Sequence, residues 1–493
     1  MHFFKMSPLF PTIFIFLLFH TMEINCQGCN ITTPCATPHC CSQWGNCGHG
    51  PDFCGDGCQH GCDSAPTCGL YAHEENFPVS VCCSQFGNCG TTSDFCGTGC
   101  QNNCGDAPTS TCQISRDMIR VGYYSSWASA RACGKYSVDE IPVGNYTHLN
   151  YAFGNIQNGV MINPSEGTEE WDNLAAFSAL KATNPAIRLL ISVGGYAFND
   201  PGPTQREFHN LAINTTTRAR FIQSVSTFSE EWNLDGCDAD WEYPVDPDRG
   251  GSPEDRENYV ALLKEMRAAF GQKWLITIAA PASYWYLRHF KVDEMQAQLD
   301  WINVMSYDYN GAWDPERLAR PHSGIREMEE SLQLFRKGGV PPEKLVFGLG
   351  FYGRSYTLTQ PECGKGSGCE FNGPGEAGAC TAGAGTLAYF EIEELIKAQN
   401  LAPGLDSLSL TRYLNYDGGK QWVTYDDEIT LKFKTDWARV NCLKGVMVWS
   451  VDQGVEKKVE EEDNTGGSET TVSGVSLVVV TFLGVLHVQG RFM

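Results

Sequence analysis

The chain has 493 residues, and its 58 acidic side chains outnumber its 35 Lys and Arg side chains, giving a formal charge of −23 at pH 7. This length allows one large domain together with smaller modules. The acidic excess argues against nucleic acid or an anionic membrane surface as a partner and suits a protein that acts on a neutral polymer.

Residues 1–25 have the features of a secretory signal peptide. A weakly basic start precedes the apolar run Phe10–Phe19, which is too short to span a membrane. Of the 23 cysteines, 17 lie between Cys26 and Cys112, and this density behind a signal predicts a disulfide framework. We therefore expect a secreted protein, located outside the cell or in its wall. Three N-x-[ST] sequons fit this compartment: Asn30, Asn145 and Asn214.

Two cysteine-rich units repeat in tandem at residues 26–63 and 68–105. Both end in the same frame: CCSQ, an aromatic residue, GNCG, four residues, FCG, a GC pair and a last Cys. A unit of fewer than about 40 residues cannot bury enough apolar surface to fold alone, so disulfides must hold it. The frame therefore predicts two small disulfide-rich modules.

From residue 118 to residue 455, short β-rich runs alternate with amphipathic, helix-like segments. Eight such strands over this length predict an α/β fold of the (β/α)8 TIM barrel type. The rival is an open doubly wound sheet, which is disfavoured because no Gly-rich phosphate turn follows an early strand. The candidate strands are Ile119–Tyr124, His148–Phe153, Arg188–Val193, Gly236–Glu242, Leu275–Ala280, Trp301–Tyr307, Leu345–Leu349 and Gly445–Trp449.

The connection between the seventh and eighth strands, about 352–426, is too long for a simple loop. It contains a helix-like stretch, Tyr389–Asn400, followed by a hairpin-like stretch at 413–423. We interpret this connection as an inserted α+β subdomain that forms one wall of a cleft.

The fourth predicted strand carries Asp238, Asp240 and Glu242, each two residues from the next. On a strand this spacing puts the three carboxyls on one face and apolar residues on the other. Asp235 has the opposite parity, so we expect it to be structural. Three crowded carboxyls cannot all ionise freely, and at least one should keep its proton near neutral pH. Enzymes that cleave glycosidic bonds use such a pair, one carboxyl protonated and the other ionised.

Other polar and aromatic residues fall at the C-terminal ends of predicted strands, where barrel active sites lie. These residues are Tyr123, Ser192, Tyr307, Asp308 and Trp449. No cluster with metal-ligand spacing occurs in the sequence, and we expect neither a metal nor a cofactor.

The tail, residues 456–493, begins with an acidic run and continues through small residues and a polar spacer to the mostly apolar stretch Val475–Val488. This order resembles a GPI-attachment signal, which would give membrane attachment. The alternative is a plain disordered tail.

Residues 235–242 match the DxxDxDxE signature of family 18 glycoside hydrolases, the chitinases. The resemblance covers roughly residues 118–455. Its further matches are Ser192-Val-Gly-Gly, Met305-Ser-Tyr-Asp, Gly350-Phe-Tyr-Gly-Arg and Met447-Val-Trp. The cysteine-rich units resemble hevein-type chitin-binding modules. Together they are similar to fungal chitinases related to killer-toxin α subunits.

The resemblance implies hydrolysis of β-1,4 linkages in chitin and chitooligosaccharides, with Glu242 as the proton donor. Such enzymes use no protein nucleophile, because the substrate's own N-acetyl oxygen attacks the anomeric carbon, with retention of configuration. Asp240 would orient the acetamido group, Asp238 would share a proton with Asp240, and Tyr307 would complete the catalytic set. The implied substrate-binding residues are Tyr123, Ser192, Tyr243, Met305, Asp308, Arg354 and Trp449. We expect a monomer.

For the modules, the resemblance implies aromatic side chains that stack on N-acetylglucosamine beside a hydrogen-bonding Ser. The matching residues are Ser42, Trp44 and Phe53 in the first module and Ser84, Phe86 and Phe95 in the second. Asn46 and Asn88 stand at a usually aromatic position, so we expect weak binding by each single module. Family pairing implies the disulfides Cys26–Cys41, Cys35–Cys47, Cys40–Cys54, Cys58–Cys62, Cys68–Cys83, Cys82–Cys96 and Cys100–Cys104. It leaves Cys89 to pair with Cys29 or Cys112.

Two other functions stay open. An endo-β-N-acetylglucosaminidase on the same scaffold is disfavoured by the chitin-binding modules and by the insertion. A catalytically weak lectin or toxin-carrier subunit usually lacks the terminal acid, which is present here as Glu242. The sequence does not distinguish endo from exo action.

Overall fold

The computed structural model describes residues 29–30, 35, 40–48, 57–62, 82–84, 89–91, 93–104 and 117–454. The predicted signal peptide and the tail from residue 456, with its GPI-like order, lie outside the described residues. Among the described helices, none has the length and apolar character needed to cross a membrane.

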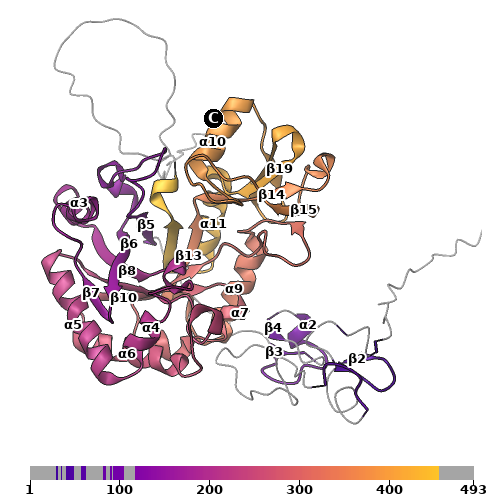
Figure 1. The fold of residues 1–493 in the computed structure, drawn as a ribbon, viewed down its shortest axis with the longest axis horizontal. Helices are drawn as coiled ribbons and strands as arrows, with labels where there is room; N and C mark the ends of the chain where they lie inside the picture. Colours follow the sequence, from indigo (N-terminus) through magenta and orange to yellow (C-terminus); the bar gives the residue numbers. More distant parts are fainter. Residues whose placement is uncertain are drawn as a thin grey trace, which may run out of the picture. The chain divides into compact units, whose positions relative to one another are not determined.

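Eight parallel strands form a closed barrel (Figure 1). The first strand, β5, closes it by pairing with β6 on one side and with the last strand, β20, on the other. The strands are β5 Ile119–Ser125, β6 His148–Gln157, β8 Arg188–Gly194, β9 Gly236–Asp240, β10 Leu275–Pro281, β11 Trp301–Met305, β13 Leu345–Gly350 and β20 Gly445–Trp449. The predicted TIM barrel is confirmed, and an open sheet is excluded.

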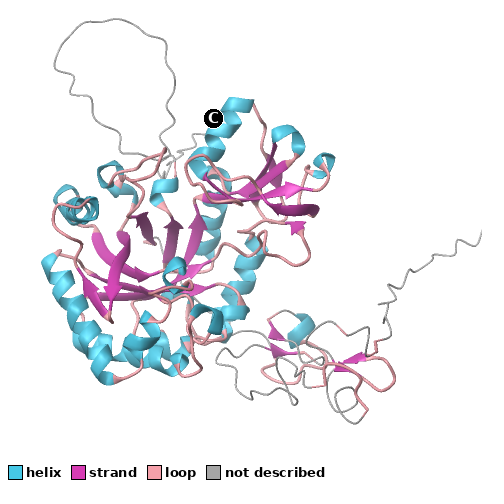
Figure 2. Ribbon diagram, viewed as in Figure 1, coloured by secondary structure: helices cyan, strands magenta, loops and turns pink. Residues whose placement is uncertain are grey.

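Helices surround the barrel strands (Figure 2). The helix α5 buries one apolar face, which includes Phe221, Val225 and Phe228. It begins at Asn214, whose side-chain oxygen accepts hydrogen bonds from the backbone N–H groups of Thr216 and Thr217 in the first turn. The helices of this layer are α3 Glu169–Thr183, α4 Glu207–Ala212, α5 Thr215–Glu231, α6 Asp255–Phe270, α7 Tyr284–Leu287, α8 Val292–Met295, α9 Ile325–Lys337 and α11 Glu428–Val440.

Side chains fill the inside of the barrel, so the barrel is a packed core and not a pore. The apolar part of this core is a cluster of buried residues from six strands: Val121, Tyr123, Ala152, Leu190, Trp301, Val346 and Met447. Polar side chains lie in the same interior, and Asp238, Thr277 and Asn303 are fully buried. Burial of polar groups at this depth requires that each finds a partner.

The insertion between β13 and β20 forms a second, antiparallel sheet beside the barrel (Figure 1). Its core contains Tyr356, Phe371 and Trp422. A disulfide, Cys133–Cys380, joins it to the loop that follows β5. Its elements are β14 Tyr352–Leu358, β15 Cys369–Pro374, β16 Thr386–Ala388, α10 Tyr389–Gln399, β17 Gly404–Asp406, β18 Thr411–Tyr416 and β19 Gln421–Tyr425, and β12 Leu318–Ala319 adds an edge strand.

The described parts of the two cysteine-rich units have the same local structure. Each contains a short two-stranded sheet: β1 Cys40–Cys41 with β2 Cys47–Gly48, and β3 Cys82–Cys83 with β4 Cys89–Gly90. In each, the second Cys of the CC pair forms an isolated bridge, Cys41 to His60 and Cys83 to Asn102. The short helix α2, Ser93–Cys96, follows β4.

Three of the predicted disulfides are confirmed, namely Cys35–Cys47, Cys58–Cys62 and Cys82–Cys96. The prediction Cys26–Cys41 is wrong, because Cys41 pairs with Cys29. The Cys29 N–H also donates to the Gly45 carbonyl at 2.8 Å, which fixes Cys29 beside the sheet. Cys54 and Cys68 lie outside the described residues, so Cys40–Cys54 and Cys68–Cys83 stay predictions, as does Cys100–Cys104.

Candidate active site

The three acids lie at the C-terminal end of β9. Asp238 and Asp240 are inside the barrel and almost inaccessible, and Glu242 is only 7% exposed. The predicted strand is two residues too long, since the ladder ends at Asp240. Beyond that point the Glu242 N–H approaches the side-chain oxygen of Asn199, at 3.4 Å, instead of a neighbouring strand. Glu242 therefore leaves the sheet just above the two aspartates.

Asp238 accepts hydrogen bonds from four side chains on four different strands. Tyr123 donates to Oδ2 at 2.6 Å, and Ser192 donates to the same oxygen at 2.9 Å. Thr277 and Asn303 donate to Oδ1. Both oxygens of the buried Asp238 carboxyl therefore have hydrogen-bond partners, as burial at this depth requires.

Asp240 has a different environment from Asp238. Burial, followed by the charge of Asp238, raises the pKa of Asp240 well above its usual range. Its Oδ1 accepts the Ala279 backbone N–H at 2.9 Å, and its carboxyl shares a side-chain hydrogen bond with Asp238. The proton of the aspartate pair therefore belongs on Asp240, as expected for two adjacent buried carboxyls.

Glu242 is the acid poised to donate a proton near neutral pH. Burial raises the pKa of Glu242 to about 7, against the lowering effects of a hydrogen bond with Tyr243 and of the Arg249 guanidinium. The Arg249 Nε also donates to the Glu242 carbonyl at 3.0 Å and so holds the backbone in place. The ring of Tyr243 stacks on Tyr286 with centroids 4.1 Å apart.

Asp235 lies away from this site, as its parity predicts. It forms ion pairs with Lys181 at 2.8 Å and Arg188 at 3.0 Å, and it accepts the Leu189 N–H at 2.8 Å. These contacts tie the start of β9 to its neighbours, which is a structural role.

A second charged centre follows β11. The backbone of Asp308 is left-handed, with φ 59°. Its carboxylate forms a two-point ion pair with Arg354 on β14, one contact being Nε to Oδ1 at 2.7 Å. Tyr352 donates to the same carboxylate at 2.8 Å, and His322 lies 3.5 Å from it. Burial opposes ionisation of Asp308, but Arg354 outweighs burial and holds the pKa of Asp308 below its usual range.

Tyr307 lies between the two centres. Burial, then the charges of Glu242 and Asp308, raise the pKa of Tyr307 well above its usual value. Its ring meets the Tyr352 ring edge to face, with centroids 5.9 Å apart. Tyr307 is therefore a neutral hydroxyl, and its contact with the Met447 sulfur, at 3.9 Å, is weak enough to leave it available as a hydrogen-bond donor.

A row of aromatic rings leads outward from the barrel. Trp449 contacts Tyr123 and lies nearly parallel to Phe153, with centroids 5.8 Å apart. Phe153 in turn stacks on Trp127, at 6.3 Å, and Trp127 is 47% exposed. Another exposed ring, Trp313, lies under the Arg354 guanidinium. Exposed aromatic faces of this kind suit the apolar faces of sugar rings.

The structure changes the roles of two predicted residues. Tyr123 and Ser192, expected to bind substrate, are buried and donate to Asp238 instead. Tyr243 and Met305 lie where predicted, beside Glu242 and at the end of β11. Sequence reasoning missed Thr277 and Asn303, although both have inward parity on their strands. It also missed Phe153, which lies within β6, and Trp127, which lies just beyond the end of β5.

In the first module, Ser42 is buried, and its Oγ accepts the Asn46 N–H at 3.1 Å. This bond supports the turn that carries Trp44, whose side chain is 69% exposed. In the second module Ser84 is buried and Phe95 is half-buried. Phe53 and Phe86 lie outside the described residues.

The family model "Glycosyl hydrolases family 18" matches residues 119–454, which include every residue of the site. The chain belongs to glycosyl hydrolase family 18. A second family model, "Chitin recognition protein", matches residues 67–104, so the second cysteine-rich unit is a module of that type.

Several family 18 proteins are similar to this chain. The endochitinase of Manduca sexta is 32% identical over 67% of this chain and 63% of its own length. The secreted chitinase LysM12 of Penicillium expansum is 30% identical over 85% of this chain and 27% of its own. The chain thus spans less than two thirds of these relatives. The crystal structure of the Ostrinia furnacalis Group IV chitinase superimposes with a TM-score of 0.63, at 31% identity over 68% of this chain and 94% of that one.

Proposed function

We propose that this protein is a chitinase that hydrolyses β-1,4 linkages between N-acetylglucosamine units. The observation that supports this function most directly is the stack of three acids: a buried Asp238 that accepts four side-chain hydrogen bonds, an Asp240 whose pKa is raised well above its usual range, and a Glu242 whose pKa is raised to about 7. This arrangement places a proton donor above a proton-sharing pair of aspartates. The chitinase names of the family 18 relatives support the same substrate.

The proposed reaction proceeds in two steps and retains configuration. Glu242 protonates the glycosidic oxygen while the substrate's acetamido oxygen attacks C1, so that the bond to the leaving sugar breaks and an oxazolinium forms. Water then attacks C1 and gives its proton to Glu242, and the bond from C1 to the acetamido oxygen breaks. No protein atom bonds to the sugar. As the oxazolinium forms, the shared proton passes from Asp240 to Asp238, and the Asp240 carboxylate accepts a hydrogen bond from the acetamido N–H and stabilises the positive charge.

The other residues of the site position the substrate. Tyr307 donates to the acetamido oxygen, and Asp308, fixed by Arg354, accepts from a sugar hydroxyl. Trp449 forms the floor beneath the reacting sugar. Trp127 and Trp313 provide further stacking surfaces along the chain of the polymer.

The two N-terminal units act together as chitin-binding modules, in an arrangement like that of killer-toxin-related fungal chitinases. The shared sequence frame and the exposed Trp44 of the first unit support this role. Each module lacks one aromatic position, so two tethered modules recover affinity through effective concentration.

The protein is secreted and acts as a monomer. Its disulfides support an oxidising compartment, and a similar Penicillium protein is named a secreted chitinase. A GPI anchor attached near the tail would hold it at the cell surface.

The test is hydrolysis of a chitin oligosaccharide, with product anomers followed by NMR, for the wild type beside Glu242→Gln. Initial β-anomers from the wild type, and a rate lower by about 10²–10⁴-fold in the variant, are the expected results. Absence of cleavage by both forms, with chitin still bound, would establish a lectin or toxin-carrier role instead. Cleavage confined to N-glycan cores would establish the endo-β-N-acetylglucosaminidase.

A further inference from the structure

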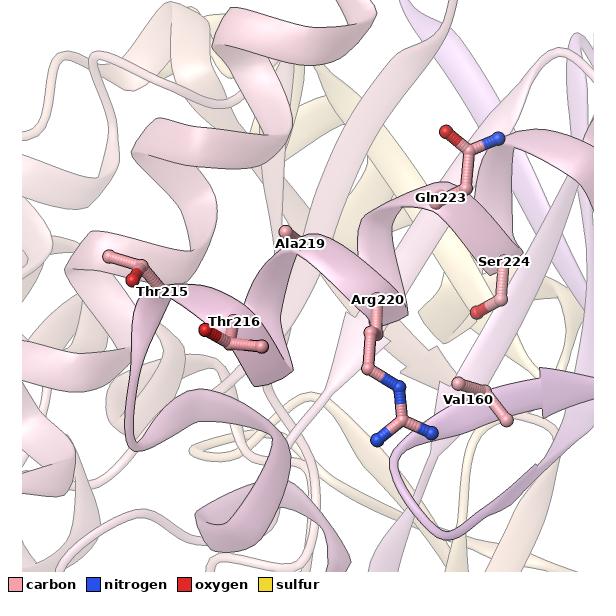
Figure 3. Close-up of a pocket in the computed structure, with 7 residues that line it drawn as sticks. All are labelled: Val160, Thr215, Thr216, Ala219, Arg220, Gln223 and Ser224. Carbon is pink, nitrogen blue, oxygen red and sulfur yellow. The ribbon is translucent and has the colours of Figure 1, made fainter.

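The outer face of α5 carries a feature that catalysis does not use. A hollow of about 670 Å³ lies along this helix beside β7, Val160–Ile162. Figure 3 shows the side chains of α5 that line it, with Val160 on the neighbouring strand. The lining residues are Val160, Thr215, Thr216, Ala219, Arg220, Gln223 and Ser224. The sequon Asn214-Thr215-Thr216 lies at one end of this hollow.

The side chain of Asn214 is exposed and held in one orientation. Its Oδ1 accepts the backbone N–H groups of Thr216 and Thr217, both at 3.0 Å. Because both bonds use the oxygen, the amide nitrogen Nδ2 takes no part in the helix cap. N-glycosylation replaces one hydrogen of Nδ2 and leaves the oxygen an acceptor, so a glycan and the helix cap are compatible.

The hollow has the chemistry that a sugar needs. The Arg220 guanidinium is exposed and makes no ion pair or hydrogen bond with another described residue, so its five N–H groups are available to sugar hydroxyls. Thr215 and Thr216 add hydroxyls, and Val160 adds an apolar surface. The sequon at Asn145 differs: Asn145 is half-buried, and the hydroxyl of Thr147 is bonded to the Arg120 backbone.

We infer that Asn214 is an N-glycosylation site and that the first N-acetylglucosamine of its glycan occupies the hollow along α5. In the modification, Nδ2 loses a proton and bonds to the anomeric carbon of an oligosaccharide carried on a polyprenyl diphosphate, and the diphosphate carrier leaves. The glycan then covers Arg220 and the exposed polar face of α5.

Occupancy is measured on the full chain made in a eukaryotic host that adds high-mannose glycans. The tryptic peptide 207–218 contains Asn214 as its sole sequon. Release by peptide N-glycosidase F in ¹⁸O-labelled water should convert Asn214 to labelled Asp in this peptide. Thr216→Ala should abolish the label, and Thr216→Ser should keep it. An unlabelled wild-type peptide would overturn the inference.

Binding in the hollow is measured by comparing two deglycosylated forms. Endoglycosidase H leaves the first N-acetylglucosamine on the protein, whereas peptide N-glycosidase F removes it and leaves Asp, which caps a helix as well as Asn does. We expect the form that keeps the first sugar to melt about 1–3 °C higher. The difference should vanish in Asn214→Asp, which keeps the cap, and persist in Asn145→Gln. Equal melting temperatures for the two wild-type forms would show that the hollow is not used.

Discussion

The hydroxyl of Tyr123, on the first barrel strand, donates a 2.6 Å hydrogen bond to Asp238, on the fourth, 115 residues further along the chain. Asn303 donates both to that hydroxyl and to Asp238, so three strands meet at one buried charge. The hydrogen-bond network at the centre of the barrel therefore supports the acids above it. Its donors satisfy the buried Asp238 carboxyl, and Asp238 adds to burial in raising the pKa of Asp240.

Removal of one of these donors should impair catalysis without unfolding the protein. Tyr123→Phe removes a hydrogen bond to a charged group, worth about 1.5–3 kcal/mol, so we expect kcat to fall about 10- to 100-fold. Tyr124→Phe is the matched control, because the Tyr124 hydroxyl donates to the Tyr136 backbone carbonyl and has Ser129, not an acid of the site, as its side-chain partner. Steady-state rates and urea unfolding should separate the two variants. Equal loss of activity in both would contradict the assigned role.

The pH profile should report the ionisation of Glu242. The acid must be protonated to donate, and its pKa is raised to about 7. Glu242 is therefore competent below that pH, and kcat/KM should decline as pH rises through about 7. Measurement with a soluble chitin oligosaccharide between pH 4 and pH 9 tests this. The fall of kcat/KM on the alkaline side is the basic limb of the profile. If this limb began below pH 5, the titrating group would not be Glu242.

Tyr243→Phe should move that basic limb in a defined direction. The hydrogen bond from Tyr243 lowers the pKa of Glu242, so its loss should raise the pKa and shift the limb to higher pH. Tyr286→Phe keeps an aromatic ring against Tyr243 and serves as the control. A shift toward lower pH, or an equal shift in both variants, would contradict this account.

The Asp308–Arg354 pair should depend on the shape of the guanidinium. Arg354→Lys keeps the charge but loses the two-point contact with Asp308. We expect kcat/KM to fall about 10-fold or more, because Asp308 then no longer has a fixed position. Arg412→Lys is the control, since Arg412 pairs with Asp427 on the same insertion but outside the site. Full activity of Arg354→Lys would show that charge alone suffices.

The Cys133–Cys380 disulfide should contribute more to stability than Cys363–Cys369. The cysteines of the first disulfide are 247 residues apart in the sequence, and those of the second are 6 residues apart. In the chain-entropy model, longer loops give larger effects. We expect the double Ala variant of the long loop to lower the free energy of unfolding by about 2–4 kcal/mol. Urea unfolding of both double variants measures this, and a larger loss for the short loop would refute it.

The sequence predicts the barrel and the acid stack because both depend on local periodicity. Alternation along β9 fixes which carboxyls share a face, whatever the neighbouring strands do. The partners of Asp238 are different, since they depend on the register between strands. Thr277 and Asn303 meet Asp238 only because β10 and β11 pair with β9 in that register, directly or in turn.

Two other features of the structure differ from what the sequence predicts, and they too depend on contacts between separate segments. The contact between Phe153 and Trp127 joins β6 to the loop after β5, and no pattern within either segment indicates it. For the first module, family pairing implies Cys26–Cys41, whereas the structure pairs Cys41 with Cys29, three residues further along the chain. The backbone bond between Cys29 and Gly45 selects Cys29, and this contact is visible only in the folded unit.

Cys237 lies between the acids in sequence but faces away from them in β9. It is buried, and it is the free cysteine among the described residues. Burial, then the two neighbouring aspartates, raise the pKa of its thiol well above the usual value, so thiolate is scarce. Thiol–disulfide exchange requires a thiolate attacker. Once the barrel has folded, Cys237 is thereby withdrawn from disulfide exchange with the cysteine-rich units.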